Sequence, residues 1–307
     1  MTDESQPSKK TDDQPSEASD TQDASRPRGP RVFGKFAFWI VAVPFIFYLF
    51  GSMMGGYVEN LRESKIRGTL DDLHHEGSDF PTEEIPLAEL EKNIDPDGKF
   101  LGVLPLNKNA YPYTYIATIA GTTLLMLIFG WGYFRAPFRI SFLSFVVGVV
   151  GVVVWIALAE LDRNFLHLSD WMFGLIPPRE AFEPLKELKG DPTWMWQFIA
   201  IRFFGLVLVV PITEEFFVRG FLMRYVEDPD WDELPLGQTQ KPWIWAVPTL
   251  YGVFAHMTEP LSALVWFSMV TWLYKRTGSI WDCVIAHSIT NLLLGIYIFK
   301  FEAWYLW

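Results

Sequence analysis

Two adjacent carboxylates and an arginine stand in an otherwise apolar part of this 307-residue chain, at Glu214, Glu215 and Arg219. On a helix, Glu215 and Arg219 are four residues apart and share a face, so they can form a structural ion pair. Glu214 points about 100° away from that face. The two carboxyls should therefore differ in pKa, which is how acid and base roles are divided in many active sites. A solvated charge cluster at a helix end is the alternative, but apolar side chains follow the acids directly: Phe216, Phe217, Phe221 and Leu222.

Two histidines and an asparagine follow in later apolar stretches. His287 and Asn291 are four residues apart, so both side chains can reach one point, while His256 stands in a separate stretch. This set predicts a general base, Glu214 assisted by His256, that activates water, and an oxyanion site formed by His287 and Asn291. Together these groups can hydrolyse a peptide bond without a covalent intermediate.

A zinc ion is the alternative to this water-activating base. Glu214, His256 and His287 supply two imidazoles and a carboxylate, a ligand set that leaves one position on zinc open. The sequence contains no Gly-x-Ser-x-Gly nucleophile motif and no His-Glu-x-x-His zinc motif. Its single cysteine, Cys283, excludes an internal disulfide and a multi-cysteine metal site. We expect no cofactor, with zinc on those three side chains as the alternative.

Apolar helices must hold these residues. Half of the chain is hydrophobic, and three long runs carry no charge, at 36–58, 114–134 and 140–159. About 20 apolar helical residues cross a hydrocarbon core of about 30 Å. Four further apolar stretches are short or contain polar groups, and lie at 194–226, 243–257, 260–275 and 279–300. The sequence therefore predicts an all-α polytopic transmembrane bundle of about seven or eight helices with seven spans, and a break or kink at Pro211.

The charges divide the chain into four expected segments. Its net charge of −11 argues against a nucleic-acid partner, because contacts with the phosphate backbone need a basic surface. Basic residues precede the first apolar run and place the N-terminus in the cytoplasm: Arg26, Arg28, Arg31 and Lys35. The expected segments are a disordered cytoplasmic tail (1–30), a first transmembrane helix with an acidic extracytoplasmic loop (31–112), two transmembrane helices with an outer loop (113–193), and a catalytic helical core (194–307).

The order of the motifs resembles that of the CPBP (Abi, CAAX protease) intramembrane endopeptidases. In that family Glu-Glu-x-x-x-Arg, Phe-x-x-x-His and His-x-x-x-Asn/Asp lie on successive transmembrane helices. The first and third motifs are complete in this chain. In the second, Gly252 stands where the family has Phe, four residues before His256, and Tyr251 or Phe254 is the candidate to replace it.

The resemblance covers about residues 194–300. It implies a helical membrane bundle with a cavity open to water, Glu214 and His256 on the water, and His287 and Asn291 on the oxyanion. It also favours a metal-independent glutamate mechanism over zinc. A looser likeness reaches the second and third spans and the C-terminal residues 304–307. There the chain is similar to the CAAX prenyl protease-related proteins that accompany bacterial exosortase systems, which implies a multi-pass protein of the bacterial inner membrane.

Two classes of function remain open at this point. The first is an intramembrane endopeptidase whose partners are the lipid bilayer and a membrane-protein or lipidated peptide substrate. The second is a non-proteolytic membrane scaffold or sorting partner that uses the same polar cavity. A transporter is disfavoured because the first three apolar runs contain no ionisable residue.

Overall fold

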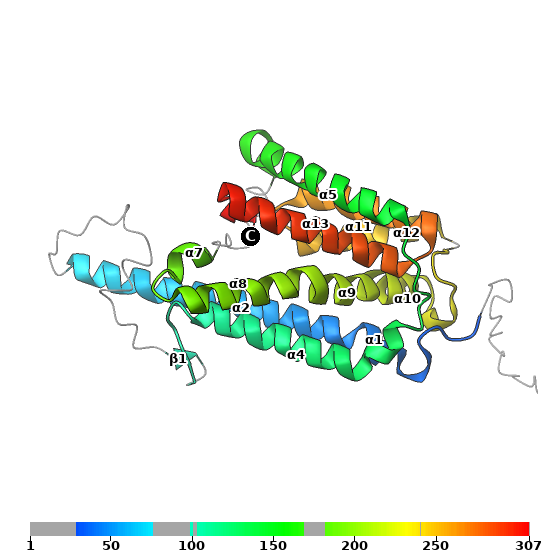
Figure 1. Cartoon of the computed structure of the whole chain (residues 1–307), viewed down its shortest axis with the longest axis horizontal. Coiled ribbons are helices and arrows are strands. Elements are labelled where there is room, and N and C mark those ends of the chain that lie inside the picture. The colour runs from blue at the N-terminus through cyan, green and yellow to red at the C-terminus, as the bar shows by residue number, and fades with distance from the viewer. Residues whose placement is uncertain (1–28, 76–98, 101–102, 169–181, 240, 307) are drawn as a thin grey trace, which may run out of the picture.

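The computed structural model describes residues 29–75, 99–100, 103–168, 182–239 and 241–306, which fold as a bundle of helices along one long axis (Figure 1). The longer helices are α2 (Val43–His75), α4 (Ala110–Tyr133), α5 (Phe142–Leu161), α8 (Pro192–Phe204), α12 (Pro260–Thr277) and α13 (Ile280–Phe301). The shorter helical elements are η1 (Gly34–Phe36), α1 (Ala37–Val41), η2 (Asp162–Leu166), α7 (Pro184–Glu187), η3 (Gly205–Val209), α9 (Val210–Glu215), η4 (Phe216–Leu222), α10 (Met223–Glu227), η5 (Trp231–Glu233), η6 (Pro242–Ala246), α11 (Val247–Ala255) and η7 (Trp304–Leu306). One antiparallel pair of two-residue strands, β1 (Lys99–Phe100) and β2 (Leu104–Pro105), interrupts the helices, and the expected all-α membrane bundle is confirmed.

Five helices in the described part of the chain are long and apolar enough to cross a membrane: Gly34–Ile66, Ala110–Tyr133, Phe142–Leu166, Pro192–Glu227 and Ile280–Phe301. Seven spans were predicted. The stretch expected at 243–257 contains a 3-10 turn, η6, and the nine-residue α11, which is about 14 Å long and too short for a hydrocarbon core. The stretch at 260–275 becomes the 18-residue α12, whose hydroxyl side chains and terminal basic residues lower its apolar character.

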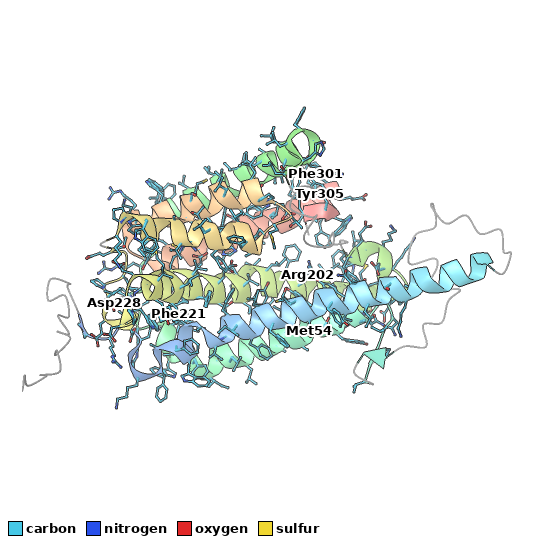
Figure 2. All side chains as sticks on the ribbon, turned by 180° about the vertical axis from the view of Figure 1, so that it is seen from behind. Met54, Arg202, Phe221, Asp228, Phe301 and Tyr305 are labelled. Carbon is cyan, nitrogen blue, oxygen red and sulfur yellow. The ribbon has the colours of Figure 1, made fainter. Side chains whose placement is uncertain are left out.

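One continuous helix lies at the centre of the bundle. The run from α8 through α10 contacts α2 and α4 on one side and α13 on the other. Figure 1 shows it between the α2–α4 pair and the layer formed by α5, α13, α11 and α12. Residues from the first, central and last parts of the chain therefore meet along this helix, and Figure 2, which labels Arg202 and Phe221 on it, shows the same order from behind.

The first apolar helix extends further than the sequence indicated. α2 continues to His75 and passes beyond the other helices at one end of the bundle, so the loop expected from residue 57 begins as helix (Figure 1). Arg62, which is buried, lies 2.8 Å from carboxylate oxygens of both Glu59 and Glu187. This ion-pair cluster ties the extension to α7. Residues 1–28 of the expected tail and residues 76–98 of the expected loop lie outside the described residues.

Candidate functional site

Two π turns flank the adjacent glutamates on the central helix. η3 and η4 are stretches of π-helix, and α9 between them ends at Glu214 and Glu215. The predicted break at Pro211 is absent, and the helix continues through this residue. The wider π turn before Pro211 accommodates the missing backbone N–H. π turns inside α-helices frequently mark functional sites, and each inserted residue rotates the following side chains by about 100°.

The central helix and α13 bring four ionisable groups into contact inside the protein. Glu214, Glu215, Arg219 and His287 are exposed by 4%, 0%, 0% and 5%. The Nη1 atom of Arg219 donates to Oε2 of Glu215 in an ion pair. The Nδ1 atom of His287 lies 3.0 Å from Oε1 of the same carboxylate. Glu215 thus pairs with Arg219 and also fixes the orientation of the imidazole.

Glu214 faces the other nitrogen of that imidazole. Its Oε2 atom lies 3.9 Å from Nε2 of His287, which is too long for a hydrogen bond. Its Oε1 atom accepts a 3.0 Å hydrogen bond from the Tyr251 hydroxyl. One carboxylate oxygen is therefore held by α11, and the other faces His287 at a distance that a water molecule beside the pair could bridge.

His256 occupies a different position from the one expected. Its Nδ1 atom lies 3.1 Å from the Gly252 carbonyl oxygen, and its ring contacts Trp155 and Phe267 with centroids 5.5 Å away in each case. Within the described residues it forms no hydrogen bond or ion pair with Glu214. The structure thus brings Glu214, Glu215, Arg219 and His287 together and leaves His256 behind a layer of aromatic rings.

Asn291 is one turn beyond His287 on α13, but its amide is engaged with the central helix. The Nδ2 atom donates a 2.9 Å hydrogen bond to the Leu206 carbonyl oxygen in η3. An asparagine amide carries two N–H donors, so one remains for another acceptor. The expected face shared by His287 and Asn291 exists, and both residues reach the central helix.

The departure from the second motif has a steric reason. A side-chain atom built on Gly252 would overlap the ring of Phe267, which arrives from α12. That ring contacts both Tyr251 and His256, with centroids 5.8 and 5.5 Å apart. Phe267 therefore fills the space that a phenylalanine at position 252 would need, and glycine is required there. Phe254, the other candidate replacement, is exposed.

Two aromatic residues of the site have no clear signature in the sequence. Tyr251 bonds Glu214 from the short α11, and the ring of Trp266 lies 4.7 Å from that of His287. Trp266 also donates from Nε1 to Thr290, at 3.2 Å. The only available signal for Tyr251 was its position in the second motif, and Trp266 is one of 14 tryptophans.

The zinc alternative needs Glu214, His256 and His287 around one point. Among the described residues, no group of three or more His, Cys, Asp or Glu side chains is arranged to hold a metal ion. His287 already uses Nδ1 on Glu215, and the Nδ1 atom of His256 faces a backbone carbonyl. The side chains as placed do not fit zinc.

Comparison with known proteins identifies the region that contains this site. No curated protein and no solved structure matches the chain. Residues 195–293, about a third of the chain, match the family model described as "Type II CAAX prenyl endopeptidase Rce1-like". The matched region includes both glutamates, Tyr251, both site histidines and Asn291. Over residues 195–293, this multi-pass membrane protein therefore carries a domain of the Rce1-like type II CAAX prenyl endopeptidase family of CPBP proteins.

Proposed function

We propose that the chain is an intramembrane endopeptidase in which Glu214 activates a water molecule. The observation that carries this proposal is the 3.9 Å gap between Oε2 of Glu214 and Nε2 of His287. The two atoms are not hydrogen-bonded to each other. The carboxylate oxygen can therefore accept a proton from water, and the imidazole nitrogen can bind a carbonyl oxygen. The family match of residues 195–293 agrees with this class of reaction.

Charge balance supports a protonated His287. The buried cluster holds two carboxylates, Glu214 and Glu215, but only one permanent cation, Arg219. Unbalanced charge is costly away from water, and a protonated imidazole makes the cluster neutral. His287 then donates from Nδ1 to Glu215 and has an N–H at Nε2 for an oxyanion.

The reaction follows from these positions. Glu214 takes a proton from water as the water oxygen attacks the peptide carbonyl carbon, and the carbonyl oxygen becomes an oxyanion. His287 Nε2 and the remaining N–H of Asn291 stabilise that charge. The proton on Glu214 then passes to the amide nitrogen, and the C–N bond breaks. Tyr251 holds the carboxylate in place through its other oxygen.

His256 is proposed as the second proton carrier. Its ring is bonded within the described residues through Nδ1 alone, and aromatic rings separate it from Glu214, so Nε2 would exchange protons with the leaving amine through intervening water and not with the water on Glu214. Half-buried at the end of α11, it is more accessible than His287.

The substrate we propose is a membrane-anchored or lipidated protein cleaved near the bilayer. The family description names CAAX prenyl endopeptidases, and the site lies among helices apolar enough to cross a membrane. We place the protein in the cell membrane, and the N-terminal basic residues favour a cytoplasmic N-terminus. A lipid bilayer and a peptide chain are thus its expected partners.

The test uses the purified full-length chain in liposomes, with membrane-anchored and prenylated peptides and product masses as the readout. We expect cleavage that is unchanged by a zinc chelator. Cleavage that the chelator removes and zinc restores would favour the metalloprotease. Peptide binding without cleavage, under any of these conditions, would favour the scaffold and refute the proposed hydrolysis.

A further inference from the structure

Pro211 creates a gap in the hydrogen bonding of the central helix. In π spacing, the N–H of each residue reaches the carbonyl five residues earlier, and Val210 follows this rule by donating to the Gly205 carbonyl oxygen. The next donor in that series would be residue 211, and its acceptor would be the Leu206 carbonyl. Proline has no N–H, so the backbone cannot make this bond.

The Leu206 carbonyl is the one that Asn291 reaches. Its Nδ2 atom lies 2.9 Å from the Leu206 oxygen, across from α13 to the central helix. The donor that Pro211 lacks is thus supplied by a side chain 85 residues away in sequence. Even a partly buried carbonyl is costly when it has no partner, which gives this bond a structural purpose.

The location of the bond connects it to the glutamates. The π turn η3 lies before Glu214, so the register of that turn sets the direction in which the glutamates project. If the turn relaxed to ordinary α spacing, the side chains after it would rotate by about 100°. Glu214 and Glu215 would then no longer face His287, the residue one helical turn before Asn291.

We propose that Asn291 is a positioning residue for Glu214, because its amide supplies the hydrogen bond that Pro211 cannot make and holds the π turn in register. The catalytic part of this inference rests on the proposed function, whereas the hydrogen-bonding part does not. The second N–H of the amide is left for the oxyanion, so the two roles of Asn291 use different atoms.

The test is a double-mutant cycle on the full-length protein. Asn291→Leu keeps most of the side-chain volume and removes both donors, while Pro211→Ala restores a backbone N–H opposite Leu206. Asn291→Leu alone should lower the thermal midpoint by about 2–6 °C. In the Pro211→Ala background, Asn291→Leu should lower the thermal midpoint by less than half as much. Equal losses in both backgrounds would overturn the proposal.

Thr290→Val is the matched control on the neighbouring residue. Thr290 donates to the Gly148 and Ala286 carbonyls and not to the central helix, so its thermal shift should be the same in both backgrounds. Pro211→Gly and Pro211→Ser supply the same N–H if Pro211→Ala does not fold. Failure of all three to fold would contradict the proposal, because it requires the turn to tolerate that donor.

Activity separates positioning from direct contact with substrate. Asn291→Leu should lower kcat by more than about 10²-fold with KM little changed, because a displacement of the base by about 1 Å can have that effect and the variant also loses the oxyanion donor. Pro211→Ala should recover at least tenfold of the loss. Recovery of the midpoint without recovery of kcat would overturn the positioning role and leave Asn291 with the oxyanion alone. A wild-type chain that cleaves nothing would refute the proposed function, while the thermal cycle would still decide the hydrogen bond.

Discussion

Replacing Arg219 with methionine should destabilise the protein strongly while leaving its shape unchanged. Arg219 and Glu215 are both fully buried, and among the described residues Glu215 keeps only His287 as a partner once the guanidinium is removed. Breaking a buried pair from one side costs about 3–5 kcal/mol because it leaves a charge uncompensated. At about 2–4 °C per kcal/mol, the thermal midpoint should fall by about 6–20 °C.

A second substitution tests whether uncompensated charge is the cause. Glu215→Gln combined with Arg219→Met removes both charges, and such neutral replacements of buried pairs are often tolerated. The double variant should therefore be more stable than Arg219→Met alone. Its activity should stay low, because His287 has lost the carboxylate on Nδ1. Thermal unfolding in detergent with a folded-yield measurement checks both variants. A single variant within about 1 kcal/mol of the wild type, or a double variant no better than the single one, would refute the reasoning.

Three smaller changes test the surroundings of the site. Tyr251→Phe should lower the thermal midpoint by about 3–12 °C and kcat about tenfold, because the buried carboxylate loses a charge-assisted hydrogen bond; an unchanged kcat would contradict this. Gly252→Ala should cost about 1–3 kcal/mol by displacing Phe267, whereas Gly130→Ala, with open space around it, should be harmless in the same unfolding assay. Burial raises the pKa of Asp232, outside the membrane spans, so stability should fall as the pH rises from its ordinary value through the raised one; midpoints against pH should lose this dependence in Asp232→Asn.

The helical bundle and the paired glutamates were predictable because both depend on local sequence pattern. In lipid the backbone N–H and C=O groups must pair with one another, and an uncharged run of membrane-spanning length achieves this as a helix. The positions of two such runs match α4 and α5 within a few residues. The spacing of Glu215 and Arg219 places them on one helical face regardless of what packs against it. Their contact therefore needed no tertiary information.

The boundaries and the partners of the site were not predictable in this way. Charges after residue 58 ended the apolar run but not the helix, since α2 continues to His75. The stretch at 243–257 became a 3-10 turn followed by a nine-residue helix, because Pro242 begins the 3-10 turn and Pro248 lies in the first turn of α11. The hydrogen bond from Tyr251 depends on how α11 packs, which no local spacing encodes.

The π turn before Pro211 is a feature of the central helix that the sequence pattern did not indicate. Hydrophobic pattern alone assumes 3.6 residues per turn, so the rotation introduced by η3 is invisible to it. Pro211 indicates where the backbone hydrogen bonding changes. Without the contact from Asn291, however, the sequence does not distinguish a proline that breaks the helix from one that the helix accommodates. In the structure Glu214 faces Nε2 of His287, whereas His256, which we expected to converge with them, faces the Gly252 carbonyl oxygen.

The most direct test of the central claim compares two glutamate variants in the same cleavage assay. Glu214→Gln removes the proposed base, and Glu302→Gln removes an exposed carboxylate at the end of α13. With a membrane-anchored peptide in liposomes, Glu214→Gln should lower kcat by at least about 10²-fold, the contribution expected of a general base, at an unchanged thermal midpoint. Glu302→Gln should cleave like the wild type. Cleavage by Glu214→Gln at the wild-type rate would contradict the account.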